Sequence, residues 1–175
     1  MFGKFLRLLS GAAVLGGAVT LIAMTVHITA DVLLKYFMNQ PLSGTLEIVS
    51  AYYMVAVVFL PLASVELARD SIAVDVGYQF MPNLMKLACM VIVFSVTTVV
   101  YAVLAYSSWG DALKSFGMRE VVMGNALVSI WPGRFVLPVS FGLAALASLY
   151  NLYLFATDAE ERRAIVSTGD VETEV

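Results

Sequence analysis

The sequence predicts an all-α membrane protein with four transmembrane helices. Of its 175 residues, 61% are hydrophobic and only 13% are charged, whereas an ordinary soluble domain carries about 25% charged residues. The mean hydropathy of +0.89 indicates that most side chains face hydrocarbon or each other rather than water. Four apolar runs account for this composition, and each is long enough to cross a hydrocarbon core of about 30 Å.

The first two apolar runs predict spans over about residues 8–30 and 46–67. His27 is the only ionisable residue in the first run, which would form about 35 Å of helix at 1.5 Å per residue. Polar residues and helix breakers gather over residues 39–44 and predict a turn between the spans. Pro61 lies inside the second span, where a membrane helix tolerates proline if neighbouring groups satisfy the freed carbonyl.

The third and fourth spans are expected over about residues 84–109 and 132–155. Trp131-Pro132 is a natural helix start, since proline suits the first turn and tryptophan favours the membrane interface. Between the two spans, acids and bases alternate with apolar residues from Asp111 to Glu120. This pattern predicts a short amphipathic helix lying at the interface. The sequence leaves open whether residues 121–131 are helical.

We therefore expect one four-helix transmembrane domain, residues 1–157, followed by a disordered cytoplasmic tail, residues 158–175, which is polar and acidic. Basic residues near the span ends predict the orientation, because cytoplasmic loops carry more Lys and Arg. Six lie on one side and four on the other, which favours cytoplasmic termini. They are Lys4, Arg7, Arg69, Lys86, Arg162 and Arg163 against Lys35, Lys114, Arg119 and Arg134.

The chain lacks the residues that most enzyme sites require. It has one histidine, His27, and one cysteine, Cys89, so neither a nucleophilic triad nor a multi-ligand metal site can be assembled. We expect no catalytic residues, no substrate-binding residues, no bound metal and no cofactor. A net charge of −3 makes nucleic acid a poor partner, and membrane lipids are the expected surroundings.

Ionisable residues inside a membrane are candidates for function because their burial is costly. No acid lies at the centre of a span, since Glu47 and Glu66 fall at opposite ends of the second one, where water or a helix end can solvate them. An autonomous proton-coupled pump therefore has no evident relay. Two interpretations of Glu47 stay open, a charge that favours the helix start and a contact with another subunit.

Several patches together resemble a known family. They are Asp31-Val-Leu-Leu-Lys-Tyr-Phe-Met-Asn-Gln-Pro-Leu-Ser-Gly-Thr-Leu-Glu47, Arg69-Asp-Ser-Ile-Ala-Val-Asp75, Trp131-Pro132 and Leu137-Pro138-Val-Ser-Phe-Gly142. Their order and spacing around four spans resemble the small membrane subunit of tripartite ATP-independent periplasmic (TRAP) transporters. The likeness extends from about Asp31 to Leu149.

The resemblance implies a heteromeric sodium-coupled transporter in a bacterial inner membrane. In such a complex a large membrane subunit holds the substrate and sodium sites, and a periplasmic binding protein delivers an organic acid. The present chain would be a scaffold that braces the large subunit and helps form the docking surface for the binding protein. Its candidate subunit contacts are the charges in the most specific patches, Lys35, Glu47, Arg69 and Asp75.

Two alternatives come from other classes of membrane protein. An autonomous small exporter working as a homodimer would need an acid in the middle of the membrane, which the sequence lacks. A membrane anchor of a respiratory enzyme could carry a haem shared between subunits, although one histidine excludes a bis-histidine haem within one chain.

Overall fold

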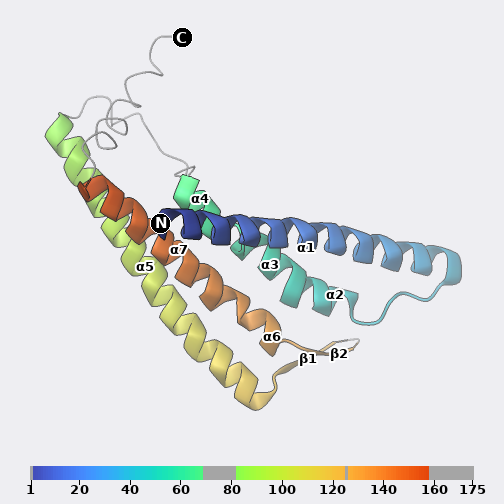
Figure 1. The fold of residues 1–175 in the computed structure, drawn as a ribbon. Helices are drawn as coiled ribbons and strands as arrows, with labels where there is room; N and C mark the ends of the chain where they lie inside the picture. Colours follow the sequence, from blue (N-terminus) through green and yellow to red (C-terminus); the bar gives the residue numbers. More distant parts are fainter. Residues whose placement is uncertain (1, 69–81, 125, 158–175) are drawn as a thin grey trace, which may run out of the picture.

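The computed structural model of the chain describes residues 2–68, 82–124 and 126–157. Within these residues, four helices are long and apolar enough to cross a membrane, which confirms the predicted fold class. They are Gly3–Met38, Thr45–Ala68, Met85–Met118 and Trp131–Thr157. The expected tail, residues 158–175, lies outside the described residues. The four helices form two antiparallel pairs, and the pairs cross each other (Figure 1).

Helix α1 (Phe2–Met38) is longer than the span predicted over residues 8–30. Its 37 residues correspond to about 55 Å at 1.5 Å per residue, so the helix continues well beyond a hydrocarbon core. Asp31 and Lys35 do not end the helix, because both side chains are compatible with a helix that has left the apolar region. Its C-terminal part extends past the neighbouring helices (Figure 1).

The second span is helical throughout but irregular. It consists of α2 (Thr45–Ile48), the π-helical turn η1 (Val49–Tyr53), α3 (Met54–Phe59) and α4 (Leu62–Ala68). The break before α4 falls at Pro61, which has no N–H to donate to the preceding turn. The helix resumes when the N–H groups of Ser64 and Val65 donate to the Pro61 carbonyl, at 2.9 and 3.1 Å.

The first helix pair comes close together at Pro61. A Cβ atom on Gly17 would lie 3.4 Å from the proline ring, and one on Gly16 would lie 3.6 Å from Leu60. The small side of α1 therefore faces the irregular part of the second span, as expected for close helix approach in membranes. His27 and Tyr53 join the same pair nearer its other end, where His27 Nδ1 lies 3.3 Å from the Tyr53 hydroxyl.

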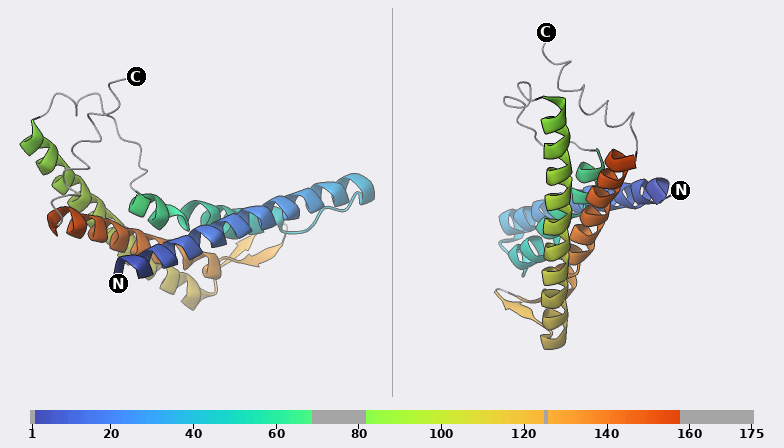
Figure 2. Two further views of the ribbon diagram at one scale, coloured as in Figure 1. Left: turned by 45° about the horizontal axis from the view of Figure 1, so that its top comes forward. Right: turned by 90° about the vertical axis from the view of Figure 1, so that its left-hand side faces the viewer.

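The second pair is formed by α5 (Asn83–Met118) and α7 (Val136–Thr157), which run side by side in both views of Figure 2. Ala144, Ala147 and Ser148 of α7 are completely buried. Such small residues let two helix backbones approach, and van der Waals packing then stabilises the pair. Phe94 and Phe155 add a ring contact across this interface, with centroids 6.0 Å apart.

One element differs from the prediction. Residues 111–118 do not form a separate interfacial helix but continue α5 to Met118. Alternating charge and apolar residues suit the exposed end of a long helix as well as a separate one, so the pattern alone cannot distinguish them. Burial of Ala112 and Ser115 keeps this end of α5 packed against its neighbours.

A β-hairpin follows α5. Strands β1 (Val121–Met123) and β2 (Leu127–Ser129) pair antiparallel, with Val122 opposite Val128. The short helix α6 (Trp131–Arg134) then leads into α7. Residues 121–131, which the sequence left open, are therefore mainly a hairpin.

Contacts through α7 connect the two pairs. The Asn151 side chain donates a hydrogen bond of 2.7 Å to the Glu66 carbonyl of α4. Phe141 packs its ring against Phe59 of α3 and Tyr101 of α5, at centroid distances of 5.3 and 6.4 Å. Helix α7 therefore contacts α5, its own partner, and also α3 and α4 of the other pair.

We predict that Gly133→Ala destabilises the protein and that Gly142→Ala does not. A Cβ atom on Gly133 would lie 2.3 Å from the Ala51 carbonyl oxygen, and this backbone atom cannot move without shifting the helix. A Cβ atom on Gly142 would meet no other atom within 4 Å. Alanine otherwise favours a helix by up to about 1 kcal/mol over glycine. Unfolding of the purified variants in mixed micelles measures the difference; equal stability of the two variants would contradict this packing.

Candidate subunit-contact surface

The hairpin packs against the start of the second span. The Tyr52 hydroxyl donates a hydrogen bond to the Ser129 carbonyl, and Gly133 of α6 lies directly against the Ala51 backbone. At the other end of the hairpin, a Cβ atom on Gly124 would lie 1.7 Å from a carboxylate oxygen of Glu47. Glycine is therefore required at this point for the Glu47 side chain to occupy its place.

An ion pair holds the base of the hairpin. Glu120 accepts a hydrogen bond of 2.8 Å from the Arg134 guanidinium and one of 2.6 Å from the Ser115 hydroxyl. The Ile130 N–H donates to the Glu120 carbonyl at 3.0 Å. Because about a third of the Glu120 side chain is exposed, solvent screens the pair and its energetic contribution is modest. Its role is geometric, since it joins α5, the hairpin and α6.

The structure describes two of the four residues predicted to contact another subunit, Lys35 and Glu47. Lys35 is exposed in the last turn of α1, and its side chain has no hydrogen bond or ion pair to any described residue. Glu47 is half-buried in the first turn of α2 and lies against the hairpin of the same chain. Arg69 and Asp75 lie outside the described residues. A subunit-contact role for all four stays a prediction.

Asp31 has a role that its place in the sequence did not indicate. Its carboxylate accepts a hydrogen bond of 2.6 Å from the Leu42 N–H, so it connects the long end of α1 to the loop before α2. Asp31 and Lys35 are four residues apart, a spacing that places two side chains on one helix face. A loop that returns to its helix could not be read from that spacing.

A second polar cluster lies at the opposite end of the second span. Glu66 was expected to be solvated there, but only 9% of it is exposed, because α7 covers it. Ser148 lies between the Phe94 carbonyl, at 3.4 Å, and the Glu66 side chain. Lys86 of α5 is also buried and has an interaction partner. The cluster joins three spans by polar contacts.

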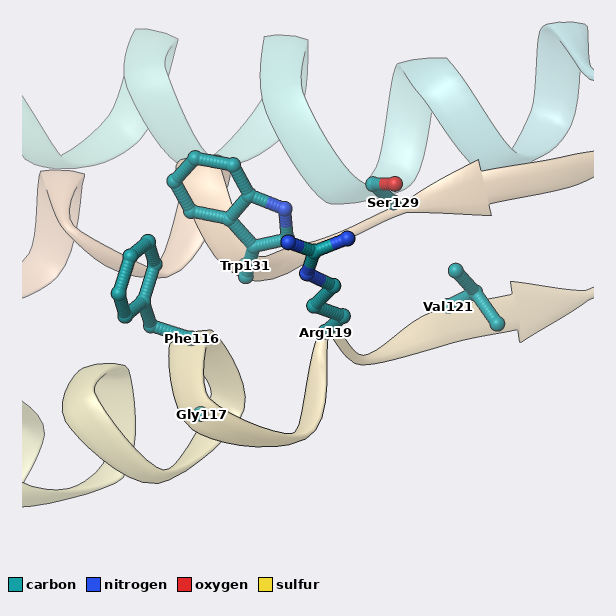
Figure 3. A pocket seen from close by; sticks show the side chains of 6 residues that line it. All are labelled: Phe116, Gly117, Arg119, Val121, Ser129 and Trp131. Atoms are coloured by element: carbon teal, nitrogen blue, oxygen red, sulfur yellow. The ribbon is translucent and has the colours of Figure 1, made fainter.

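A pocket of about 590 Å³ opens beside the hairpin. Its lining residues are Phe116, Gly117, Arg119, Val121, Ser129 and Trp131. The Arg119 side chain extends from the turn between α5 and β1 toward Trp131, whose ring also faces Phe116 (Figure 3). Nowhere in the described ranges do three His, Cys, Asp or Glu residues gather at a metal-binding distance.

A comparison with known protein families gives a match over residues 24–158. The matching family is described as "Tripartite ATP-independent periplasmic transporters, DctQ component". The chain belongs to this family. No curated protein and no solved structure gives a significant match. The family match confirms the resemblance to the small TRAP subunit and identifies the chain as a transporter component of the membrane, in preference to an autonomous exporter or a respiratory anchor.

Several polar groups of this DctQ subunit hold its helices together. Asn151 bonds α7 to α4, and Glu120 bonds to Arg134 of α6. Large apolar side chains remain exposed along α1 and α5, among them Leu8, Leu15 and Ile22 on α1 and Ile92, Val99 and Tyr106 on α5. Lipid or another subunit must cover these faces.

We predict that Glu47→Ala and Gly124→Ala both loosen the hairpin. The first removes the carboxylate, and the second forces it away from its place against Gly124. If the contact contributes about 1 kcal/mol, amide hydrogen exchange over residues 121–129 should accelerate roughly fivefold. Asp111→Ala is the matched control, because this exposed acid pairs only with Lys114, at 3.8 Å. Unchanged exchange in both hairpin variants would contradict the intramolecular contact.

Proposed function

We propose that this DctQ subunit is the scaffold of a sodium-coupled TRAP importer for an organic acid. A large membrane subunit holds the substrate and sodium sites in this proposal, and a periplasmic binding protein delivers the substrate. The present chain braces the large subunit in the bacterial inner membrane while the transport domain moves. Family membership supports the partners, and the internal structure of the chain supports the division of labour.

One observation carries the scaffold proposal. The four spans are linked to each other, but little of their apolar surface is covered within the chain. Only 11% of the most apolar stretch of α1 is buried within the chain, and only 6% of the most apolar stretch of Met85–Met118 is. Such a frame presents two broad helix faces on which a larger membrane protein can pack. In lipid this packing depends on shape and polar contacts rather than on hydrophobic burial.

We propose that both termini lie in the cytoplasm. The six-to-four distribution of basic residues supports this orientation. The hairpin, Lys35 and Glu47 then face the periplasm, where a binding protein would arrive. Arg69 and Asp75 belong to the cytoplasmic loop in this arrangement. The docking surface would therefore include the end of the molecule where the hairpin joins α2 and α6.

We predict that Lys35→Ala and Arg69→Ala weaken co-purification with the large subunit. A charge that bonds across a boundary shielded from water leaves its partner unsatisfied when removed, at a cost of about 1 to 3 kcal/mol. Lys114→Ala is the control, because Lys114 is exposed and already near Asp111. The yield of complex, normalised to inserted subunit, is the measurement. Equal yields for all three variants would return Lys35 and Arg69 to ordinary surface charges.

We further predict that the subunit alone transports nothing. The sequence has no acid at the centre of a span and shows no internal repeat, so we expect the subunit to lack a binding cavity for coupled transport. Liposomes with only this chain should show no sodium-dependent uptake of organic acids. Adding the large subunit and the binding protein should restore uptake. Uptake by the small chain alone would refute the scaffold proposal.

A further inference from the structure

The pocket beside the hairpin lies between the end of the third span and the start of the fourth. The helix of the third span ends at Met118, and that of the fourth begins at Trp131. Arg119, Val121 and Ser129 occupy the short segment between them and line the pocket. Trp131 and Arg119 are also the residue types that favour the boundary between hydrocarbon and water.

The pocket offers hydrogen-bond donors without a matching acid. The Arg119 guanidinium and the Trp131 indole N–H can only donate, and the Ser129 hydroxyl can donate as well. None of these three side chains has a hydrogen bond or ion pair to a residue that the structure describes. None of the six lining residues is acidic. A ligand that supplies negatively charged oxygen atoms would satisfy all three donors.

Arg134 provides a contrast at the same end of the molecule. Its guanidinium is already bonded to Glu120 at 2.8 Å, and it does not line this pocket. The positive charge of Arg134 is therefore compensated by the Glu120 carboxylate, whereas that of Arg119 has no such partner among the described residues. Figure 3 shows the Arg119 side chain directed toward Trp131, so the two donors can approach one ligand.

The rest of the pocket is apolar and held in place. Phe116 contacts the Trp131 ring in a T-shaped arrangement, with centroids 5.1 Å apart and planes at 74°. This contact orients the indole, and Val121 lies on the opposite side of the opening. Phe116 and Val121 are about half exposed. A ligand that has a charged head and an apolar body would contact both parts.

We propose that this pocket binds the phosphodiester headgroup of an anionic membrane phospholipid, with Arg119 as its charge partner. Phosphate oxygens accept hydrogen bonds from guanidinium groups with favourable geometry. A pocket between the ends of two spans, with Trp131 and Arg119 in its lining, suits the depth of headgroups, and its apolar side can contact the start of an acyl chain. No lining residue carries a negative charge that could pair with the ammonium of a zwitterionic lipid, so phosphatidylglycerol fits better than phosphatidylethanolamine. The proposal does not depend on which side of the membrane the hairpin faces.

Quenching of Trp131 fluorescence by brominated lipids tests the proposal. A Trp109→Phe background leaves Trp131 as the only tryptophan, since the chain has two. The full chain is reconstituted in vesicles of phosphatidylglycerol and phosphatidylethanolamine, with bromine on the chains of one lipid at a time. We expect phosphatidylglycerol to be preferred at Trp131 by about fivefold, the effect of one basic residue at a membrane surface.

The variants separate the pocket from general charge. Arg119→Gln should reduce the preference to about one. Lys114→Gln removes the same charge from the end of α5 but not from the pocket, and it should leave the preference unchanged. Val121→Phe keeps Arg119 but fills the opening, so it should also reduce the preference. Circular dichroism confirms that each variant stays helical.

Four results would overturn the proposal. The first is an absence of preference in the parent protein, and the second is an equal preference in Arg119→Gln. The third is an equal loss in Lys114→Gln, which would show an effect of overall charge. The fourth is displacement by soluble glycerol phosphate at millimolar concentration, which would assign the pocket to a free phosphate compound. A preference that needs Arg119 and an open pocket, and that soluble phosphate does not remove, supports a lipid site.

Discussion

Close packing of α7 against α5 and α4 is the interaction on which the rest of the structure depends. Lipid is as apolar as the side chains of the helices, so the hydrophobic effect contributes little to their association. Ala144 and Ala147 are completely buried in the interface, and their small side chains allow the helix backbones to approach closely. Asn151 then adds a hydrogen bond to α4. These contacts stabilise the crossing of the two helix pairs.

The backbone imposes a second constraint. Inside hydrocarbon every N–H and carbonyl must find a partner within the protein, so irregular segments survive only where protein covers them or water reaches them. Pro61 meets this condition by facing Gly17 of α1. The hairpin meets it by lying between Met118 and Trp131, beyond the ends of two span helices. Both irregularities bring segments together, and the hairpin also creates the pocket.

Parts of the contact surface could be anticipated from sequence, and parts could not. Glu47 and Lys35 stood out because they are charges in the patches that resemble the small TRAP subunit. The Gly124-Asn125 pair between two short runs that contain valine is a hairpin signal, but three residues per strand are too few to show a period of two. Burial of Glu66 could not be foreseen, since it is covered by α7, whose Asn151 lies 85 positions further along the chain.

The sequence by itself determined that this chain has four helices able to cross a membrane and to which family it belongs. Those conclusions rest on transfer energies that add residue by residue along the chain and on the order of local patches. Tertiary structure alone decided which helices pair, that residues 111–118 extend α5, and that Glu120 meets Arg134 while Arg119 does not share that acid. Such contacts join distant segments, and their geometry depends on side-chain volumes at the crossing points, which no local pattern records.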